Sequence, residues 1–179
     1  ESIADSFDQV TVLFADIVAF TPMASGTPPQ KLVQILNEIF SAFDRMAETH
    51  GLEKIKTIGD AYMVAGGIPD RSDGHVNAVA AMGLDMLGWM GGYRERTGLE
   101  IGLRIGIHTG PVVAGVIGAK KFIYDLWGDT VNLASRMESQ GSRDQIQVTE
   151  AVYEQLSDVY PFEKRGTLDV KGRGEMVTY

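Results

Sequence analysis

Two aspartates, Asp16 and Asp60, stand where they could bind one cation together. Asp16 interrupts an apolar run that begins at Val10 and resumes at Ile17, and a carboxylate in such surroundings must be paired, neutral or bound to a cation. Asp60 follows Gly59 between two short extended runs, a pattern that predicts a tight β-hairpin. If the hairpin lies beside the first strand, the two carboxylates meet at a sheet edge. There they suit Mg²⁺ or Mn²⁺, with phosphate oxygens and water completing the coordination shell.

Each candidate also has a plainer structural explanation. Aspartate is a common cap, and Gly-Asp is a common hairpin turn whatever the function. Asn132 and Arg136 stand four apart in a helical segment and project from one face, as any surface polar pair would. His108 could be a base, but a structural histidine is the favoured interpretation. A helix that begins near Phe20 and Thr21 offers N–H groups to phosphate oxygens, although an ordinary strand-to-helix turn explains it as well.

Periodicity and turn residues predict the elements that position these side chains. We expect a polar lead-in over residues 1–9, a strand from Val10 to Ile17, and a helix capped by Thr21 with Pro22 in its first turn. The order of strands, helices and hairpins indicates an α+β fold, with one mostly antiparallel sheet and helices packed on it. The remaining predictions are helices over 29–50, 75–96 and 129–138, a hairpin over 52–65, strands over 99–108 and 112–117 separated by a turn at 109–111, a strand over 146–148, a short helix from Thr149, and a final hairpin over 162–177.

Composition narrows the class of protein. The 179 residues are 44% hydrophobic and 22% charged, which is typical of a single globular domain. The net charge of −8 argues against a nucleic-acid partner. No apolar run is long enough to cross a membrane, so this segment itself should make no membrane contact. No secretory signal is visible in the sequence, and the absence of cysteine fits a reducing compartment. We therefore expect a cytoplasmic domain, and since it lacks an initial Met, a piece of a longer protein that could carry a membrane anchor.

Four blocks of sequence resemble the catalytic domain of class III nucleotidyl cyclases. They occur in the family's order and span nearly the whole chain, so the resemblance is more specific than a single motif. Among the family's members, the homodimeric bacterial adenylyl cyclases are the most similar. The blocks are LFADIVAFT at 13–21, KIKTIGDAYM at 54–63, YDLWGDTVNLASRME at 124–138 and VKGRG at 170–174.

The resemblance implies a single domain over residues 1–179, with a ferredoxin-like βαββαβ core and a C-terminal extension. The implied reaction is attack of the ribose 3′-oxygen on the α-phosphorus of a nucleoside triphosphate, assisted by two Mg²⁺ or Mn²⁺ ions. The matching positions imply that Asp16, Asp60 and the backbone carbonyl of Ile17 hold the two metals. They also imply that Asn132 orients the ribose and that Arg136 stabilises the transition state.

The resemblance also assigns residues to the substrate. Lys56 and Asp125 match the two positions that choose the base. A lysine donor and an aspartate acceptor complement N1 and the 6-amino group of adenine, so we expect ATP as the substrate. Lys171 and Arg104 match residues on the phosphate side. Phe20 and Thr21, at the expected helix start, complete the expected substrate contacts.

The family builds each active site between two catalytic domains, and this chain carries both sets of residues. We therefore expect a head-to-tail homodimer with two equivalent sites related by a twofold axis. A guanylyl cyclase remains an alternative that would share everything except the base-selecting pair. A non-catalytic nucleotide-sensing or dimerisation module is the other, although it predicts the loss of a key Asp, Asn or Arg, and none is lost. The signature of diguanylate cyclases is absent.

Overall fold

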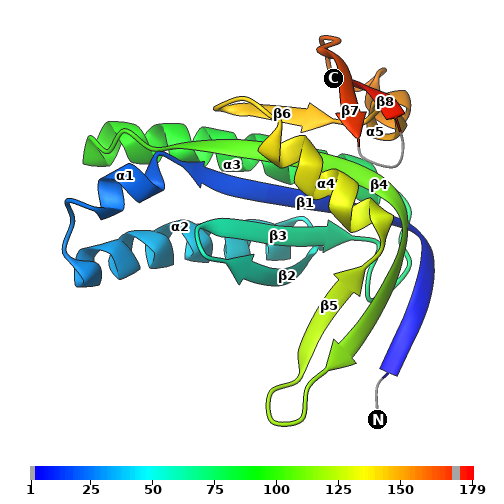
Figure 1. Cartoon of the computed structure of the whole chain (residues 1–179), viewed down its shortest axis with the longest axis horizontal. Helices are drawn as coiled ribbons and strands as arrows, with labels where there is room; N and C mark the ends of the chain where they lie inside the picture. Colours follow the sequence, from blue (N-terminus) through cyan, green and yellow to red (C-terminus); the bar gives the residue numbers. More distant parts are fainter. Residues whose placement is uncertain (1–2, 171–173) are drawn as a thin grey trace.

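The computed structural model describes residues 3–170 and 174–179, which form one sheet covered by helices and a separate small hairpin (Figure 1). The elements are β1 (Ile3–Val18), α1 (Phe20–Ala24), α2 (Pro29–Thr49), β2 (Glu53–Ile58), β3 (Ala61–Gly66), α3 (His75–Thr97), β4 (Gly102–Ile117), β5 (Ile123–Trp127), α4 (Asp129–Ser139), β6 (Gln145–Val148), α5 (Glu150–Leu156), β7 (Gly166–Val170) and β8 (Gly174–Thr178). The elements follow the expected order with two differences: the strands expected over 99–108 and 112–117 form one strand, and β5 was not predicted.

The strand order confirms the predicted core. Neighbours in the main sheet run β2-β3-β1-β4-β5, and the pairs along this path are antiparallel. With α2 between β1 and β2 and α3 between β3 and β4, the first four strands form the expected βαββαβ unit. β6 adds to β4 in parallel, and β7 and β8 form the hairpin of the C-terminal extension. The fold is therefore α+β with a mixed sheet.

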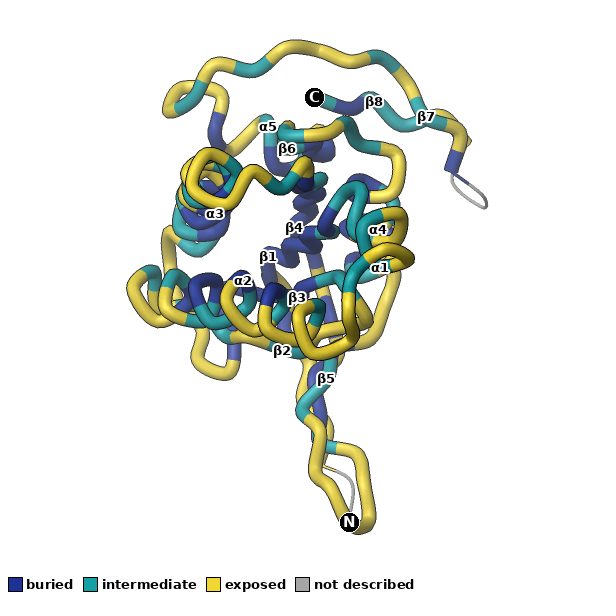
Figure 2. Tube along the Cα trace, turned by 90° about the vertical axis from the view of Figure 1, so that its left-hand side faces the viewer, coloured by how far each residue is buried: buried dark blue, intermediate teal, exposed yellow. Residues whose placement is uncertain are grey.

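Helices cover both faces of the sheet. In Figure 2, α2 and α3 lie on one side of β1 and β4, and α4 lies on the other. Side chains of β1 alternate between these two layers: Leu13 and Ala15 join the core under α2 and α3, whereas Val12 and Phe14 join a second core with residues of α4. Asp16 follows Val12 and Phe14 at two-residue steps along the strand, so it lies on the same face of β1, toward α4. Within residues 3–170 and 174–179, no helix has the length and apolar character to cross a membrane.

Two strands are longer than the sequence predicts. The lead-in expected over residues 1–9 is wrong, because β1 pairs with β4 from Ile3 onward. The turn expected at 109–111 is also wrong, since β4 runs through it as one strand. Pro111 cannot donate a ladder hydrogen bond, and it falls where the β1–β4 register shifts between Phe7 and Val10. A local irregularity in the partner strand thus accommodates the proline without ending the strand.

The extra strand length builds a projecting arm. We use "arm" for residues 3–7, 112–117 and 123–127, with the loop that joins β4 to β5. Figure 1 shows this arm extending beyond the helices. Its length follows from the pairing of β4 with β1 along one edge and with β5 along the other.

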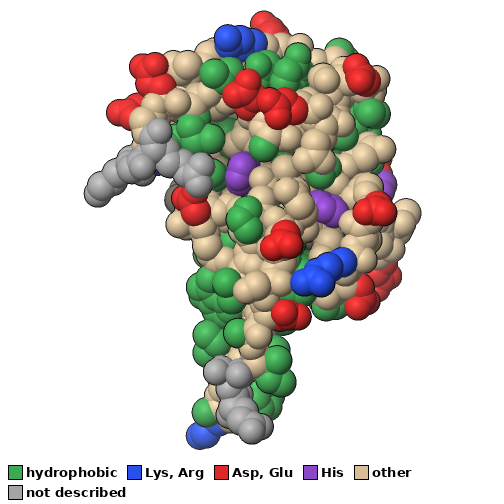
Figure 3. Space-filling view, turned by 90° about the vertical axis from the view of Figure 1, so that its right-hand side faces the viewer, with side chains coloured by type: hydrophobic (Ala, Val, Ile, Leu, Met, Phe, Trp, Pro, Cys, Tyr) green, Lys and Arg blue, Asp and Glu red, His purple; other side chains and the backbone are tan. Residues whose placement is uncertain are grey.

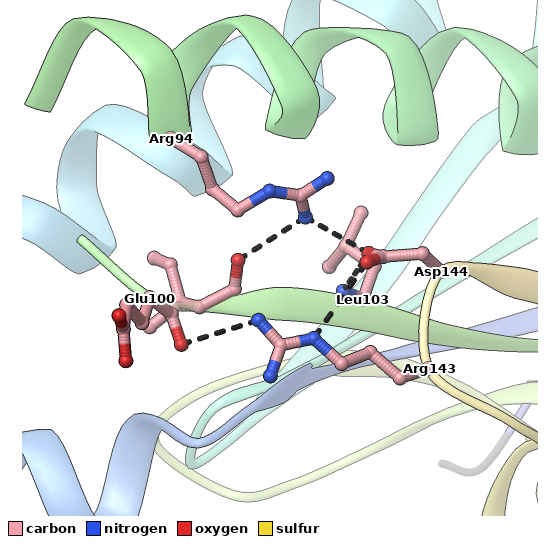
Figure 4. A network of polar contacts seen from close by, with 6 residues as sticks. Arg94, Glu100, Leu103, Arg143 and Asp144 are labelled. Atoms are coloured by element: carbon pink, nitrogen blue, oxygen red, sulfur yellow. Dashed lines mark hydrogen bonds and ion pairs between the residues drawn. The ribbon is translucent and has the colours of Figure 1, made fainter. Parts of the chain in front are cut away.

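A polar network fastens the start of β4 to its neighbours (Figure 4). Asp144 Oδ1 accepts hydrogen bonds from Leu103 N at 3.2 Å and from Arg94 Nη1 at 2.9 Å. The N–H of Asp144 donates to the carbonyl of Leu103 at 2.6 Å, and Arg143 donates to the carbonyl of Glu100 at 3.3 Å. Asp144 has a left-handed φ of 59°, which aspartate tolerates better than most residues. The network joins α3 and the segment before β6 to the strand that carries Arg104.

Candidate active site

Asp16 and Asp60 meet at the end of β1, as the spacing predicted. β1 and β3 are paired at Asp16 and Ala61, which places the β2–β3 turn beside Asp16. The N–H of Ile17 donates to the carbonyl oxygen of Asp60 at 3.2 Å and ties the turn to the strand. Burial, followed by the nearby Asp60 carboxylate and by Glu138, raises the pKa of Asp16 from 3.8 to about 7. The two carboxyl groups therefore lie close enough to disfavour each other's charge.

Arg104 provides positive charge beside this pair. β4 is paired with β1 at Arg104 and Asp16, and Arg104 Nη2 lies 3.3 Å from Asp16 Oδ2. Its Nε donates to Glu138 Oε2 of α4 at 2.7 Å. One guanidinium thus bridges a carboxylate on β1 and a carboxylate on α4. Arg104 therefore lies beside the two aspartates, and its role on the phosphate side stays a prediction.

The carboxylate pair fits a divalent cation. A bound cation would offset the repulsion that raises the pKa of Asp16. The described residues contain no group of three or more His, Cys, Asp or Glu side chains suited to a metal, so the two aspartates would leave coordination positions for phosphate oxygens and water. Mg²⁺ and Mn²⁺ accept this kind of incomplete protein shell. Asp16, Asp60 and the carbonyl of Ile17 remain the predicted ligands.

Lys56 and Asp125 come together from distant parts of the chain. Lys56 lies on β2 and Asp125 on β5, and Lys56 Nζ donates to Asp125 Oδ2 at 2.7 Å. Their side chains are 36% and 18% exposed. The other carboxylate oxygen of Asp125 accepts from the N–H of Leu126 at 2.8 Å, which fixes its orientation. A donor and an acceptor are thereby held side by side at the surface.

The polar face of α4 carries Asn132 and Arg136. Asn132 is exposed and Arg136 is half-buried, while Leu133, Ala134 and Met137 turn toward the sheet. The four-residue spacing therefore places both polar side chains on the outer part of the helix. Both remain available to a ligand approaching α4 from outside.

Other predicted residues have different outcomes. The prediction that Thr21 caps α1 is wrong: the N-cap is Ala19, with a left-handed φ of 67°, and Thr21 is exposed within the helix. Phe20 packs against the core beneath α2 and α3. His108 is buried, and its Nδ1 lies 2.7 Å from Thr149 Oγ1, which suits a structural role. Lys171 falls outside the described residues.

Three cavities in the described part of the chain, of about 680, 580 and 490 Å³, are lined by residues other than the predicted site residues. The candidate site lies along the α4 side of the sheet. Sequence reasoning also missed Glu138, which the family motif places two residues after Arg136, because only the contact with Arg104 shows what it does.

Comparisons with known proteins agree with this geometry. The family described as "Adenylate and Guanylate cyclase catalytic domain" matches residues 3–179. An adenylate cyclase of Mycobacterium tuberculosis is 50% identical over 99% of this chain, and the chain spans 40% of that relative's length. The receptor-type guanylate cyclase gcy-28 of Caenorhabditis elegans is 44% identical over 98% of this chain and 14% of its own length.

Solved structures share the whole fold. The catalytic core of a rhodopsin-guanylyl cyclase with converted specificity, in complex with ATPαS, superposes with a TM-score of 0.94 at 36% identity. The superposition covers 98% of this chain and 96% of that one. The family match, the two-aspartate edge and the βαββαβ core all lead to one assignment. The chain belongs to the family of class III adenylyl and guanylyl cyclase catalytic domains.

Proposed function

We propose that this domain is an adenylyl cyclase, which converts ATP to 3′,5′-cyclic AMP and pyrophosphate. The single observation that carries the choice of ATP is the Lys56–Asp125 pair, held at 2.7 Å. Lys56 Nζ would donate to N1 of adenine, and Asp125 would accept from the 6-amino group. Guanine has the opposite polarity at these two positions. It would leave the Lys56 donor facing the N1–H donor, and the Asp125 acceptor facing the O6 acceptor. The 50% identical relative named adenylate cyclase supports the same choice.

The reaction makes one bond and breaks one. The 3′-oxygen of the ribose bonds to the α-phosphorus, the bond from that phosphorus to the bridging oxygen breaks, and pyrophosphate leaves with the electron pair. The proton of the 3′-hydroxyl passes to solvent water. Asp16, Asp60 and the Ile17 carbonyl would hold two divalent cations, which when bound lower the charge on the phosphate oxygens. Alignment and charge neutralisation are then the main tasks of the protein.

The remaining residues fit those tasks. Asn132 would orient the ribose, so that the 3′-oxygen faces the α-phosphorus. Arg136 would donate to the oxygens on which charge develops, since a guanidinium is always charged and offers several donors. Arg104 and Lys171 would bind the terminal phosphates. Phe20 and Thr21, at the start of α1, would contribute contacts beside them.

Catalytic domains of this family act as dimers on a nucleotide, and we propose a head-to-tail homodimer with two shared sites for this chain. In each site the Asp16–Asp60 edge of one copy would face the Lys56–Asp125 pair and α4 of the other. Asn132 is exposed and Asp16 and Arg136 are half-buried, so all three are accessible to a second copy, which supports this arrangement. So does the arm, where hydrophobic side chains gather on the face seen in Figure 3. Its exposed members are Ile3, Val113, Ile117, Phe122, Ile123 and Trp127, and an apolar patch of this kind marks an interaction surface.

Product analysis tests the proposal. The purified domain should be supplied with ATP and GTP in parallel, in Mn²⁺, at rising protein concentration. Cyclic AMP as the dominant product, with specific activity that climbs with concentration, is the expected result. Cyclic GMP would identify a guanylyl cyclase, which the guanylate cyclase relative at 44% identity keeps as the second candidate. No product at any concentration would favour the nucleotide-sensing module.

A further inference from the structure

Glu138 is a buried carboxylate on α4 that contacts a residue of the candidate site. Only 9% of the residue is exposed, and its Oε2 accepts from Arg104 Nε at 2.7 Å. A carboxylate at this depth is costly unless it is paired, and the arginine pairs it. Neighbouring buried residues of the helix, such as Leu133 and Met137, serve the core instead. The ion pair with Arg104 therefore explains why the Glu138 carboxylate faces the sheet.

Close packing of α4 on β4 makes this contact possible. Gly106 lies two residues after Arg104, on the same face of β4. A Cβ added at Gly106 would lie 2.0 Å from the backbone N of Glu138 and 2.5 Å from the carbonyl carbon of Met137. Only glycine permits the helix backbone to approach the strand this closely. The approach brings the Glu138 carboxylate within reach of the guanidinium on the same strand.

The bridge leaves the two sides of Arg104 with different partners. The Nε–H bond to Glu138 is short and partly buried, and Glu138 is the less exposed acid, with a side chain 12% exposed. The Nη2 contact with Asp16 is longer, at 3.3 Å, and the Asp16 side chain is 24% exposed. The contact with Glu138 therefore anchors the guanidinium, and the contact with Asp16 is the one that another ligand can replace.

We propose that Glu138 is a positioning residue for the cyclase reaction, which holds Arg104 by its Nε so that its Nη groups can turn from Asp16 to the phosphates of the substrate. The inference rests on the proposed function of Arg104. Glu138 touches neither substrate nor reacting atoms in this account and acts through Arg104 alone. Without it, the arginine would keep its charge and lose its fixed position, which lowers the benefit of a preorganised donor.

A double-mutant cycle tests the proposal. Glu138→Gln removes the charge at nearly constant shape, Glu138→Asp keeps the carboxylate, and Arg104→Gln removes the partner. Each is made alone, and Glu138→Gln is also combined with Arg104→Gln. Glu154→Gln, at an exposed position of α5, is the matched control. The readouts are kcat and KM for ATP and, separately, the dissociation constant of 3′-deoxy-ATP, which lacks the attacking hydroxyl. Melting curves verify that each variant is folded.

The expected pattern is a loss that disappears without the arginine. Glu138→Gln should lower kcat/KM by about 10- to 100-fold, as expected when a charged hydrogen bond is lost, and Glu138→Asp should recover part of it. On the Arg104→Gln background, Glu138→Gln should change kcat/KM by less than about threefold. A fully active Glu138→Gln, or losses that multiply in the double variant, would overturn the proposal.

The two proposals fail differently. If the parent domain binds 3′-deoxy-ATP and makes no cyclic AMP, the proposed function is refuted. The dissociation constants of 3′-deoxy-ATP still decide whether Glu138 acts through Arg104. They give the same double-mutant cycle from binding alone, without turnover. A parent domain that does not bind the nucleotide refutes both proposals.

Discussion

Exchanging Lys56 for Glu together with Asp125 for Cys should change the preferred substrate from ATP to GTP. A glutamate carboxylate can accept from N1–H of guanine, and a cysteine thiol can donate to its O6. In this chain the two side chains already touch, with Lys56 Nζ 2.7 Å from Asp125 Oδ2. Each presents its polar atom beside the other, so the pair should act on the base as one unit.

The expected size follows from the two contacts. A buried polar group left facing the wrong partner costs about 1–3 kcal/mol. Two such contacts cost about 2–6 kcal/mol, and about 1.4 kcal/mol is a factor of ten in kcat/KM. The parent domain should therefore favour ATP over GTP by at least about 30-fold, and by up to about 10⁴-fold. The double variant should reverse the preference.

The contact between the two residues also predicts the order of the single variants. Lys56→Glu alone places a second carboxylate beside Asp125, so it should be less active with either nucleotide than the double variant. Stability should not confound the result, because a partly exposed ion pair contributes only about 0.2–1 kcal/mol. The assay is the ratio of cyclic AMP to cyclic GMP formed from equal ATP and GTP. An unchanged ratio in the double variant would refute this account of base recognition.

Three further predictions concern charge, stability and assembly. With the pKa of Asp16 raised to about 7, the native chain binds more protons than the unfolded one between pH 4 and 7, so metal-free stability should fall as pH rises through that range. Mn²⁺ should accordingly raise the melting temperature more at pH 8 than at pH 5.5, and Asp16→Asn should remove the difference. Asp144→Ala should lower the free energy of unfolding by about 1–3 kcal/mol, because Leu103 N loses its acceptor; Asp144→Asn, which keeps an acceptor, should lose less in the same urea titration. Phe122→Ser should raise the dimer dissociation constant about tenfold in sedimentation, since the ring is 75% exposed in the single chain and burial of a Phe contributes about 1.5–3 kcal/mol. Val33→Ser, at a position 67% exposed on α2, is its control, and equal effects from both would argue against the arm.

Local sequence patterns predicted most of the elements because each pattern had one dominant physical cause. The helices over 29–50 and 75–96 were found within one residue of α2 and α3, since apolar spacing and flanking glycines both mark them. The two hairpins were found for the same kind of reason, from Gly-rich turns between extended runs. The order of strands in the sheet came only from the family resemblance, because pairing of distant segments leaves no trace in local periodicity.

The errors occurred where tertiary pairing overrode local chemistry. Pro111 beside Gly110 resembles a turn, yet β1 pairs along the whole of β4 and absorbs the proline at an irregularity. Thr21 resembles an N-cap, but the backbone turns one step earlier, at Ala19. The polar residues between positions 1 and 9, such as Asp5, Asp8 and Gln9, suggest a lead-in, although pairing with β4 makes residues 3–7 part of the sheet. The first and third errors come from the pairing of β1 with β4, which lie far apart in the sequence. The second comes from the backbone conformation at Ala19.

The site was predictable in part for the same reasons. Asp16 and Asp60 could be placed together from the hairpin and strand patterns, since both lie at element ends. The contact of Lys56 with Asp125 spans 69 residues, and only the family resemblance linked the two. Glu138 was missed because its role depends on Gly106, which sets how closely α4 approaches the sheet.

Mixing two inactive variants tests most directly the claim that each site is shared between two chains. Asp16→Ala removes a metal ligand, and Arg136→Ala removes a transition-state donor, so each variant alone should be inactive. In an equal mixture about half of the dimers are mixed, and each mixed dimer holds one intact site. Cyclic AMP production should therefore return to about a quarter of the parent rate at the same total concentration. A mixture as inactive as its two components would contradict the shared-site account.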